Sequence, residues 1–388
     1  MSTLIPLSVP SVQGREWQYV KECLDTEWIS SAGKYVEIFE EKIANYTGAR
    51  YAISCVNGTS ALQVSLRLAG VKPGDEVIVP TLTFIAPVNT IAYNGAVPVF
   101  MDADNYYNID VEKTIDFIQT QTYYRNDATY NKITNKRISA IVPVHVWGNA
   151  AWLDKLVPLC QERNISVVED ASESLGTFYI KGQFSGKHTG TLGKLGCLSF
   201  NGNKIITTGG GGMILTDDID LANKAKYLTT QAKDNPVYFI HDEIGYNFRL
   251  TNIQAAIGLA QLEQLPNYLK RKKEIYFKYF DCVKNIDHFS IANVPNYSKN
   301  NHWLNIFLLN DEIIINEIID YLEKKYIETR PIWQLNHLQK PYKSCQSYKI
   351  ENAPKLINQS LCLPSSVSIT DKQISSVIIK LKKYFKVK

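Results

Sequence analysis

The feature of this 388-residue chain that most constrains its fold is an alternation of short apolar runs with amphipathic segments. The apolar runs lie at 52–56, 76–80, 97–102, 139–144 and 166–170. Segments with helical periodicity lie between them at 61–69, 86–94 and 153–163. Helices placed between successive strands are typical of a parallel sheet that is covered by helices. The pattern therefore predicts an α/β fold with a mostly parallel central sheet.

The pattern changes after about residue 250. A helical segment at 253–265 is expected to end at Pro266, because proline removes a backbone donor and disfavours a helix interior. It is followed by a charged helix at 267–284, a strand-like run at 303–309 and a helical segment at 313–325. We therefore expect a large domain over 1–255 and a smaller α+β domain over 256–388. The polar stretch 112–137 is expected to begin as a helix and then run over the surface.

Composition and charge exclude several classes of protein. The net charge is +4 and the basic residues are spread along the chain, so nucleic acid is not an expected partner. The seven cysteines include no C-x-x-C pair, which indicates reduced thiols and a cytoplasmic protein. Three prolines interrupt the most apolar stretch, 77–100, which argues against a membrane span. No metal is expected, because the six histidines show no H-x-x-x-H spacing.

Two polar motifs follow predicted strands. Asn57, Gly58, Thr59 and Ser60 lie between a strand and a helix, where backbone N–H groups and hydroxyls form a phosphate site. The same residue types also cap helices for structural reasons alone. The run 167–171 reads V-V-E-D-A, so a buried strand ends in two acids at the sheet edge where ligands gather in open α/β sheets. Capping of the next helix is the alternative for these acids, and both interpretations stay open.

Lys204 ends the sequence S-F-N-G-N-K and precedes four consecutive glycines at 209–212. Glycines permit close backbone approach and unusual dihedral angles. The order does not fit a P-loop, in which the lysine follows the glycines, and no G-x-G-x-x-G opens a suitable helix. A functional lysine and an ordinary lysine in a surface loop both remain open. The polar segment 241–250 is, on local evidence, a loop.

Taken in order, these motifs resemble those of the DegT/DnrJ/EryC1/StrS family of sugar aminotransferases, which depend on pyridoxal 5'-phosphate (PLP). The matching sequences are N-G-T-S-A-L, T-L-T-F-I-A, V-V-E-D-A-S-E-S-L-G, S-F-N-G-N-K and G-Y-N-F-R-L. The resemblance runs from about residue 5 to the C-terminal helix. It implies the aspartate aminotransferase-like fold (fold type I), PLP as cofactor, and a homodimer with shared active sites.

The resemblance also implies roles for individual residues. Lys204 matches the lysine to which PLP is attached, and Asp170 matches the acid that pairs with the pyridine nitrogen. Asn247 matches an asparagine that reaches the phosphate held by the partner subunit. The other implied cofactor-binding residues are Gly58, Thr59, Ser60, Phe84, Glu173 and Ser199. Among these, Glu173 departs from the family, in which Gln commonly lies against the ring hydroxyl. The glycines at 209–212 depart from the usual G-E-G-G-like sequence.

The implied activity is transfer of an amino group from glutamate to C4 of a nucleotide-linked 4-keto-6-deoxy sugar in the synthesis of a surface glycan such as O-antigen lipopolysaccharide. The sequence W-I-S-S at 28–31, the polar stretch 112–137 and the glycine-rich segment after Lys204 resemble the branch that serves legionaminic acid, so UDP-4-keto-6-deoxy-N-acetylhexosamine is the expected substrate. Expected substrate-binding residues are Trp28, Ser30, Lys34, Arg249, Arg330, Trp333 and His337. A purely fold-supporting role is the alternative for the last three.

Two other functions remain open at this stage. The family also contains dehydratases that replace the lysine by histidine, and the presence of Lys204 favours amino transfer over that chemistry. A regulator that binds PLP or a sugar nucleotide without catalysis is the third hypothesis. The absence of a DNA-binding motif in the sequence counts against it.

Overall fold

The computed structural model describes residues 4–235, 237–284, 286, 288–309 and 315–387. Within these residues the largest sheet has ten strands. Its main path runs through β1 (Tyr51–Cys55), β10 (Gly212–Thr216), β9 (Leu195–Ser199), β7 (Ser166–Asp170), β6 (Arg137–Ile141), β2 (Glu76–Pro80), β3 (Val97–Met101) and β15 (Ser347–Tyr348). Neighbouring strands from β9 to β15 are parallel, whereas β10 is antiparallel to both of its neighbours. The predicted mostly parallel sheet is confirmed.

Helices cover this sheet, as the alternating pattern predicted. Those that pack on strands are α2 (Lys34–Thr47) and α7 (Ile219–Thr229) on β1, α3 (Gly58–Leu68) on β9 and β10, α4 (Ile85–Tyr93) on β3, and α6 (Leu156–Glu162) on β7. All five residues of β2 are buried. A continuous apolar strand of this kind is typical of a parallel sheet with both faces covered.

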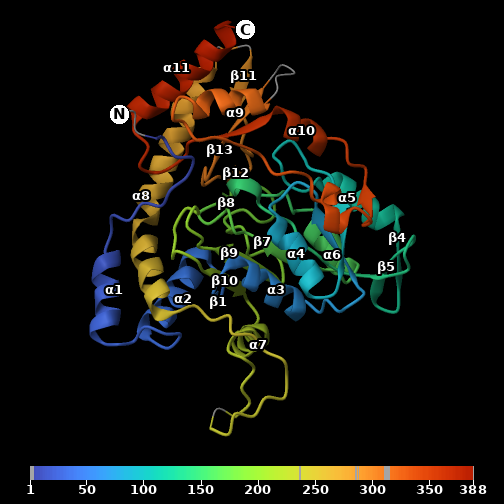
Figure 1. The fold of residues 1–388 in the computed structure, drawn as a ribbon. Coiled ribbons are helices and arrows are strands. Elements are labelled where there is room, and N and C mark those ends of the chain that lie inside the picture. Colours follow the sequence, from blue (N-terminus) through green and yellow to red (C-terminus); the bar gives the residue numbers. More distant parts are fainter. Residues whose placement is uncertain (1–3, 236, 285, 287, 310–314, 388) are drawn as a thin grey trace.

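The C-terminal part of the chain builds a smaller antiparallel sheet. Its order is β11 (Phe289–Ile291), β13 (Asn305–Leu309), β16 (Ser360–Leu363) and β14 (Arg330–Pro331). The helices α9 (Ile315–Glu323) and α11 (Asp371–Val387) lie beside this sheet at one end of the molecule (Figure 1). The predicted strand at 303–309 corresponds to β13 and the predicted helix at 313–325 to α9. Residues 313 and 314 of that helix lie outside the described residues.

The prediction that a helix ends at Pro266 is wrong. The helix α8 (Asn252–Val283) continues through this proline over 32 residues and links the two regions (Figure 1). An interior proline costs about 3 kcal/mol. However, α8 packs against α1 (Glu16–Asp25) and α2, and further along it supplies Ile275 and Tyr279 to the core of the smaller region. This packing outweighs the local preference, and the predicted domain limit at 255/256 falls inside the first turn of α8.

The polar stretch 112–137 begins as the predicted helix, and most of the residues after that helix are exposed as predicted, but the excursion is an ordered hairpin. After α5 (Val111–Thr120), the strands β4 (Thr122–Arg125) and β5 (Ala128–Asn131) form a hairpin, and β5 pairs with β6 of the large sheet. Asn131 is buried and donates a hydrogen bond to the Glu76 carboxylate at 2.7 Å. The polar residue Asn131 is therefore used inside the fold, while residues 124–127 and 132–136 remain exposed.

Candidate active site

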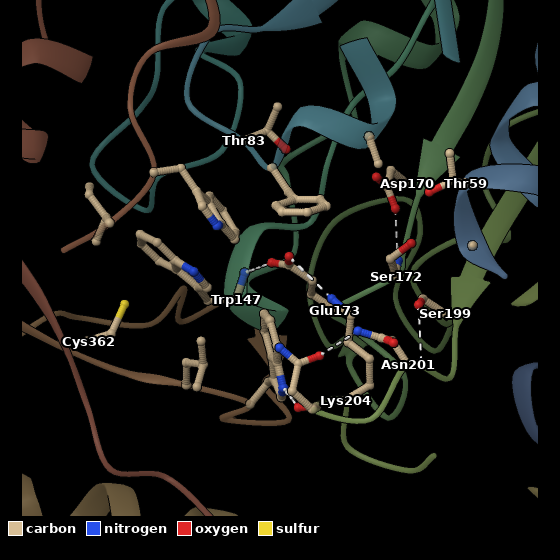
Figure 2. A pocket seen from close by; sticks show the side chains of 18 of the residues that line it. Thr59, Thr83, Trp147, Asp170, Ser172, Glu173, Ser199, Asn201, Lys204 and Cys362 are labelled. Atoms are coloured by element: carbon tan, nitrogen blue, oxygen red, sulfur yellow. Dashed lines mark hydrogen bonds and ion pairs between the residues drawn. The ribbon is translucent and has the colours of Figure 1, made fainter. Parts of the chain in front are cut away.

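A pocket of about 590 Å³ lies at the carboxyl end of β7, between the large sheet and the smaller region. Its walls come from the start of α3, the end of β7, the loop after β9 and the short helix η1 (Val146–Gly148). Segments near residues 303 and 330–333 complete it from the C-terminal side. Figure 2 shows Asp170 and Thr59 on one side of the pocket, Glu173 and Lys204 in the middle, and Cys362 on the other side.

One end of the pocket is a helix N-terminus surrounded by hydroxyl groups. The Asn57 side chain caps α3 by accepting the N–H of Ser60 at 2.7 Å, so the capping role is real. A Cβ atom added to Gly58 would lie only 2.8 Å from Ser199 Cβ and 3.3 Å from Ser172 Oγ. Glycine thus allows the first turn of α3 to approach two serine hydroxyls closely. The positive end of the helix dipole with these donors suits a phosphate group.

Asp170 ends β7 and is 4% exposed. Its carboxylate accepts the backbone N–H of Ser172 at 3.0 Å. Burial raises the pKa of Asp170, and the hydrogen bonds from Ser172 and the charge of Lys204 offset this only in part. No ion pair to Asp170 occurs among the described residues. A buried carboxylate in this state would be stabilised by a cationic or N–H group placed in the pocket.

Lys204 extends into the middle of the pocket. Its Nζ lies 3.5 Å from Glu173 Oε1 and 4.1 Å from the centre of the Trp303 ring. The other oxygen of Glu173 accepts the backbone N–H of Trp147 at 2.7 Å (Figure 2). Burial raises the pKa of Glu173, whereas the charge of Lys204 and the Trp147 N–H oppose that rise. The Lys204 amine, the carboxyl groups of Asp170 and Glu173, and the N-terminus of α3 therefore line the same pocket.

Aromatic side chains form the remaining wall. The Trp147 and Trp333 rings stack with their centroids 5.3 Å apart, and Phe84 lies 6.2 Å from Trp333. Phe84 is 52% exposed and borders the pocket, so its ring is available to a bound planar group. Arg330 adds a cationic side chain that is paired with Glu328 at 2.9 Å.

Several predicted site residues do not line this pocket. They are Trp28, Ser30, Lys34, Ser60, Asn247, Arg249 and His337. Ser60 is buried beside Thr59 in the first turn of α3, and His337 contacts the Thr81 hydroxyl at 2.6 Å. Trp28 and Lys34 border a separate pocket of about 330 Å³, where Lys34 pairs with Glu22. Asn247 is exposed. The roles implied for these residues remain predictions.

Three pocket residues were missed by sequence reasoning: Ser172, Trp147 and Trp303. Ser172 is part of the matching motif but was not singled out there. Trp147 has a φ of 53°, a left-handed conformation that non-glycine residues rarely adopt and that clusters at functional sites. Trp303 is brought to Lys204 from far along the chain. Neither Trp147 nor Trp303 lies in a sequence motif that indicates a functional site.

The described residues show no cluster of His, Cys, Asp and Glu that could hold a metal ion. All seven cysteines are free thiols. No helix in the described part of the chain has the length and apolar character needed to cross a membrane.

Comparison with known proteins agrees with this geometry. Residues 10–382 match the DegT/DnrJ/EryC1/StrS aminotransferase family. The GDP-perosamine synthase of Escherichia coli O157:H7 is 39% identical over 98% of this chain and 98% of its own length. That of Caulobacter vibrioides is 36% identical over 97% of each. The crystal structure of the aminotransferase TlmJ from Streptoalloteichus hindustanus superposes with a TM-score of 0.88 at 25% identity, covering 99% of both chains.

The fold, the pocket and these relatives define a sugar aminotransferase that uses PLP, with the fold type I architecture. The chain belongs to the DegT/DnrJ/EryC1/StrS aminotransferase family. The pocket fits the cofactor on its own geometry. The close approach at Gly58 brings the Ser172 and Ser199 hydroxyls to the N-terminus of α3, a set of donors that suits a phosphate. Asp170 is a buried carboxylate without an ion-pair partner among the described residues.

Proposed function

We propose that this chain transfers an amino group from glutamate to C4 of a nucleotide-linked 4-keto-6-deoxy sugar. The observation that carries the proposal is the position of the Lys204 amine, inside a pocket that also contains Asp170 and the N-terminus of α3. A lysine at this position favours amino transfer over the dehydratase reaction, since the dehydratases of the family have a histidine there.

We assign the following roles in cofactor binding and proton transfer to individual residues. Thr59, Ser199 and the first turn of α3 would hold the phosphate of PLP, and Phe84 would cover the ring. Asp170 would keep a proton on the ring nitrogen, since its negative charge favours the protonated form. When bound, PLP supplies an electron-accepting ring that stabilises negative charge on the carbon that gains or loses the amino group. Lys204 would hold and move a proton at Nζ as general acid–base.

The nucleotide attached to the sugar substrate has two candidates, GDP and UDP. The relatives at 39% and 36% identity are named GDP-perosamine synthases, which supports a GDP-linked sugar. The resemblance to the legionaminic acid branch supports UDP-4-keto-6-deoxy-N-acetylhexosamine instead. We place the GDP-linked sugar first, because the identity to these relatives extends over nearly the whole chain.

We also propose a homodimer with shared active sites, in the cytoplasm. A loop below α7 projects from the body of the molecule in Figure 1. It exposes apolar side chains, with Val237, Tyr238 and Phe239 each more than 70% exposed. A second copy of the chain would cover them, and the exposed Asn247 follows this loop. The seven free thiols support a reducing compartment.

The test is product analysis by mass spectrometry. Purified protein with PLP and glutamate is expected to convert one of the two 4-keto sugars to its 4-amino form, and Lys204→Ala is expected to abolish the conversion. Omitting glutamate should stop the reaction. A dehydrated product that forms without an amino donor would establish the dehydratase instead. Tight ligand binding without any product would support the regulator.

A further inference from the structure

The surroundings of the Lys204 amine attract a cation. A carboxylate oxygen of Glu173 lies 3.5 Å from Nζ, and the face of the Trp303 ring lies 4.1 Å from it. Both a carboxylate and an aromatic face stabilise an ammonium group. A protonated amine has no lone pair with which to attack a carbonyl carbon. One proton must therefore leave Nζ before PLP can be attached to this lysine.

Glu173 is the base in position to accept that proton. Within the described residues it provides the hydrogen-bond acceptor for Nζ. Its other oxygen is held by the Trp147 N–H at 2.7 Å, which keeps Oε1 directed toward the amine (Figure 2). The Glu173 side chain is 5% exposed, so bulk water reaches it poorly. Asp170 hydrogen-bonds the Ser172 N–H instead and forms no ion pair with Lys204.

The charges around Glu173 make it a ready proton acceptor. Burial raises its pKa above the ordinary value, the Lys204 charge and the Trp147 N–H lower it, and the charge of Asp170 raises it again. The Cys362 thiol lines the same pocket, and burial raises its pKa to about 12, so it stays neutral. Arg330 lies on the same pocket wall but pairs with Glu328.

We propose that Glu173 is a catalytic residue that takes a proton from Lys204 when PLP is attached. The inference rests on the proposed function, in which Lys204 carries the cofactor. The ammonium gives one proton to Glu173 Oε1, and the freed lone pair forms the bond from Nζ to the aldehyde carbon. The carbon–oxygen bond breaks, and the oxygen leaves as water with the two remaining amine hydrogens. A glutamine at this position, as is common in the family, could not accept that proton.

The experiment measures attachment of PLP to the full chain after the cofactor has been stripped. PLP is mixed with the protein, the absorbance change is followed over time, and borohydride reduction with peptide mass spectrometry locates the modified lysine. Glu173→Gln keeps the size of the side chain and an acceptor for the Trp147 N–H, but it removes the base. Glu112→Gln is the matched control, because Glu112 pairs with Lys155 on the surface at 3.0 Å and is 74% exposed.

We expect wild type and E112Q to attach PLP at similar rates, with little change between about pH 6 and pH 8. E173Q is expected to be about tenfold slower or more at about pH 6 and to accelerate with rising pH, because its proton must leave to water. Added formate, a small carboxylate base, should accelerate E173Q and leave wild type unchanged. Neither the pH trend nor the rescue by formate is expected from a purely structural role.

The outcomes separate this inference from the proposed function. If wild type does not attach PLP at Lys204, the proposed function is wrong. If wild type does attach it and E173Q matches wild type at every pH, or is slow without a pH trend or formate rescue, the assignment of Glu173 is wrong. Should E173Q fail to fold, Glu173→Asp keeps a shorter carboxylate. E173D is expected to load more slowly than wild type with the same level pH profile, and a profile that rises with pH would overturn the assignment.

Discussion

Glu169 and Asp170 are neighbours at the end of β7, both buried, yet their surroundings are opposite. The Glu169 carboxylate contacts His145 Nε2 at 2.9 Å and accepts the backbone N–H groups of Gly190, Leu192 and Gly193 at 2.6–2.9 Å. Burial alone would raise its pKa, but His145 and the N–H groups of Gly193 and Gly190 lower it below the ordinary value. Burial keeps the pKa of Asp170 raised, although the Ser172 hydrogen bonds and the charges of Lys204 and His145 oppose that rise.

The contrast distinguishes a carboxylate that maintains the fold from one that awaits a ligand. Glu169 is satisfied by groups of the protein itself, as buried charges must be in a stable structure. Asp170 and Glu173 have fewer hydrogen-bond donors than Glu169, their pKa values are raised, and both line the pocket. A buried charge with few hydrogen-bonding partners lowers the stability of the folded protein. Such a charge is expected at a site that a bound group completes.

The largest effect is expected from Asp170→Asn. This substitution should reduce amino transfer about 100-fold or more, because the ring nitrogen loses the charge that keeps it protonated. The cofactor-free variant should melt at the same temperature as wild type or higher, since a poorly satisfied charge is removed. Rate measurements with saturating PLP and thermal unfolding without PLP check both parts. A clear loss of stability without PLP would show that Asp170, like Glu169, stabilises the fold.

Glu169→Gln should show the reverse behaviour. One of the N–H donors would face the amide NH2 group in place of an oxygen, which costs about 2 kcal/mol of folding free energy. Activity per folded molecule should stay within about tenfold of wild type, because Glu169 does not line the pocket. Denaturant unfolding and a rate corrected for the folded fraction measure the two quantities. Full stability combined with lost activity would contradict the distinction.

The pH dependence of stability should separate the two kinds of carboxylate. Because the pKa of Glu173 is raised on folding, its contribution to stability is present below the unfolded value of about 4.5 and is lost as pH rises through the folded pKa. Glu169, with a lowered pKa, contributes above that value and loses its contribution as pH falls. Cofactor-free Glu173→Gln should therefore melt above wild type at neutral pH, and the difference should close toward about pH 4. Equal melting temperatures throughout this range would show that Glu173 carries no such cost.

The smallest effect is expected from an exposed carboxylate. Glu112→Gln should change the free energy of unfolding by no more than about 0.5 kcal/mol, since a solvent-exposed pair with Lys155 contributes little. Its amino-transfer rate should equal that of wild type. Chemical denaturation provides the check, and a larger effect would mean that burial is not what separates these carboxylates.

Much of the fold could be predicted because it depends on local pattern. The strands at 76–80 and 166–170 were predicted with their observed limits, since each contains consecutive β-branched residues next to polar or turn residues. Pro266 misled the prediction, because packing of α8 against distant helices outweighs a local helix-breaking preference. The pairing of β15 with β3 in the large sheet was not predicted, because a strand of two residues is too short to show a periodic pattern.

The site residues likewise include some that local motifs predicted and some that depend on long-range packing. Lys204, Asp170 and Gly58 lie in compact motifs, and the structure places them in one pocket as those motifs suggested. Trp303 reaches Lys204 only through the long-range path of α8 and β13, and the left-handed conformation of Trp147 depends on its three-dimensional surroundings. The distinction between Glu169 and Asp170 likewise depends on donors from residues 190–193, which no pattern near β7 reveals.

Whether Lys204 carries PLP for amino transfer is tested by an absorbance spectrum of the purified protein with PLP, recorded before and after addition of glutamate and then of the keto sugar. We expect a band of lysine-bound cofactor that is absent in Lys204→Ala. Glutamate should convert this band to that of the amine form of the cofactor, and the correct keto sugar should restore it. Wild-type protein that shows no lysine-bound band with excess PLP, or a band that no amino donor changes, would contradict the assignment of Lys204 as the residue that carries the cofactor for amino transfer.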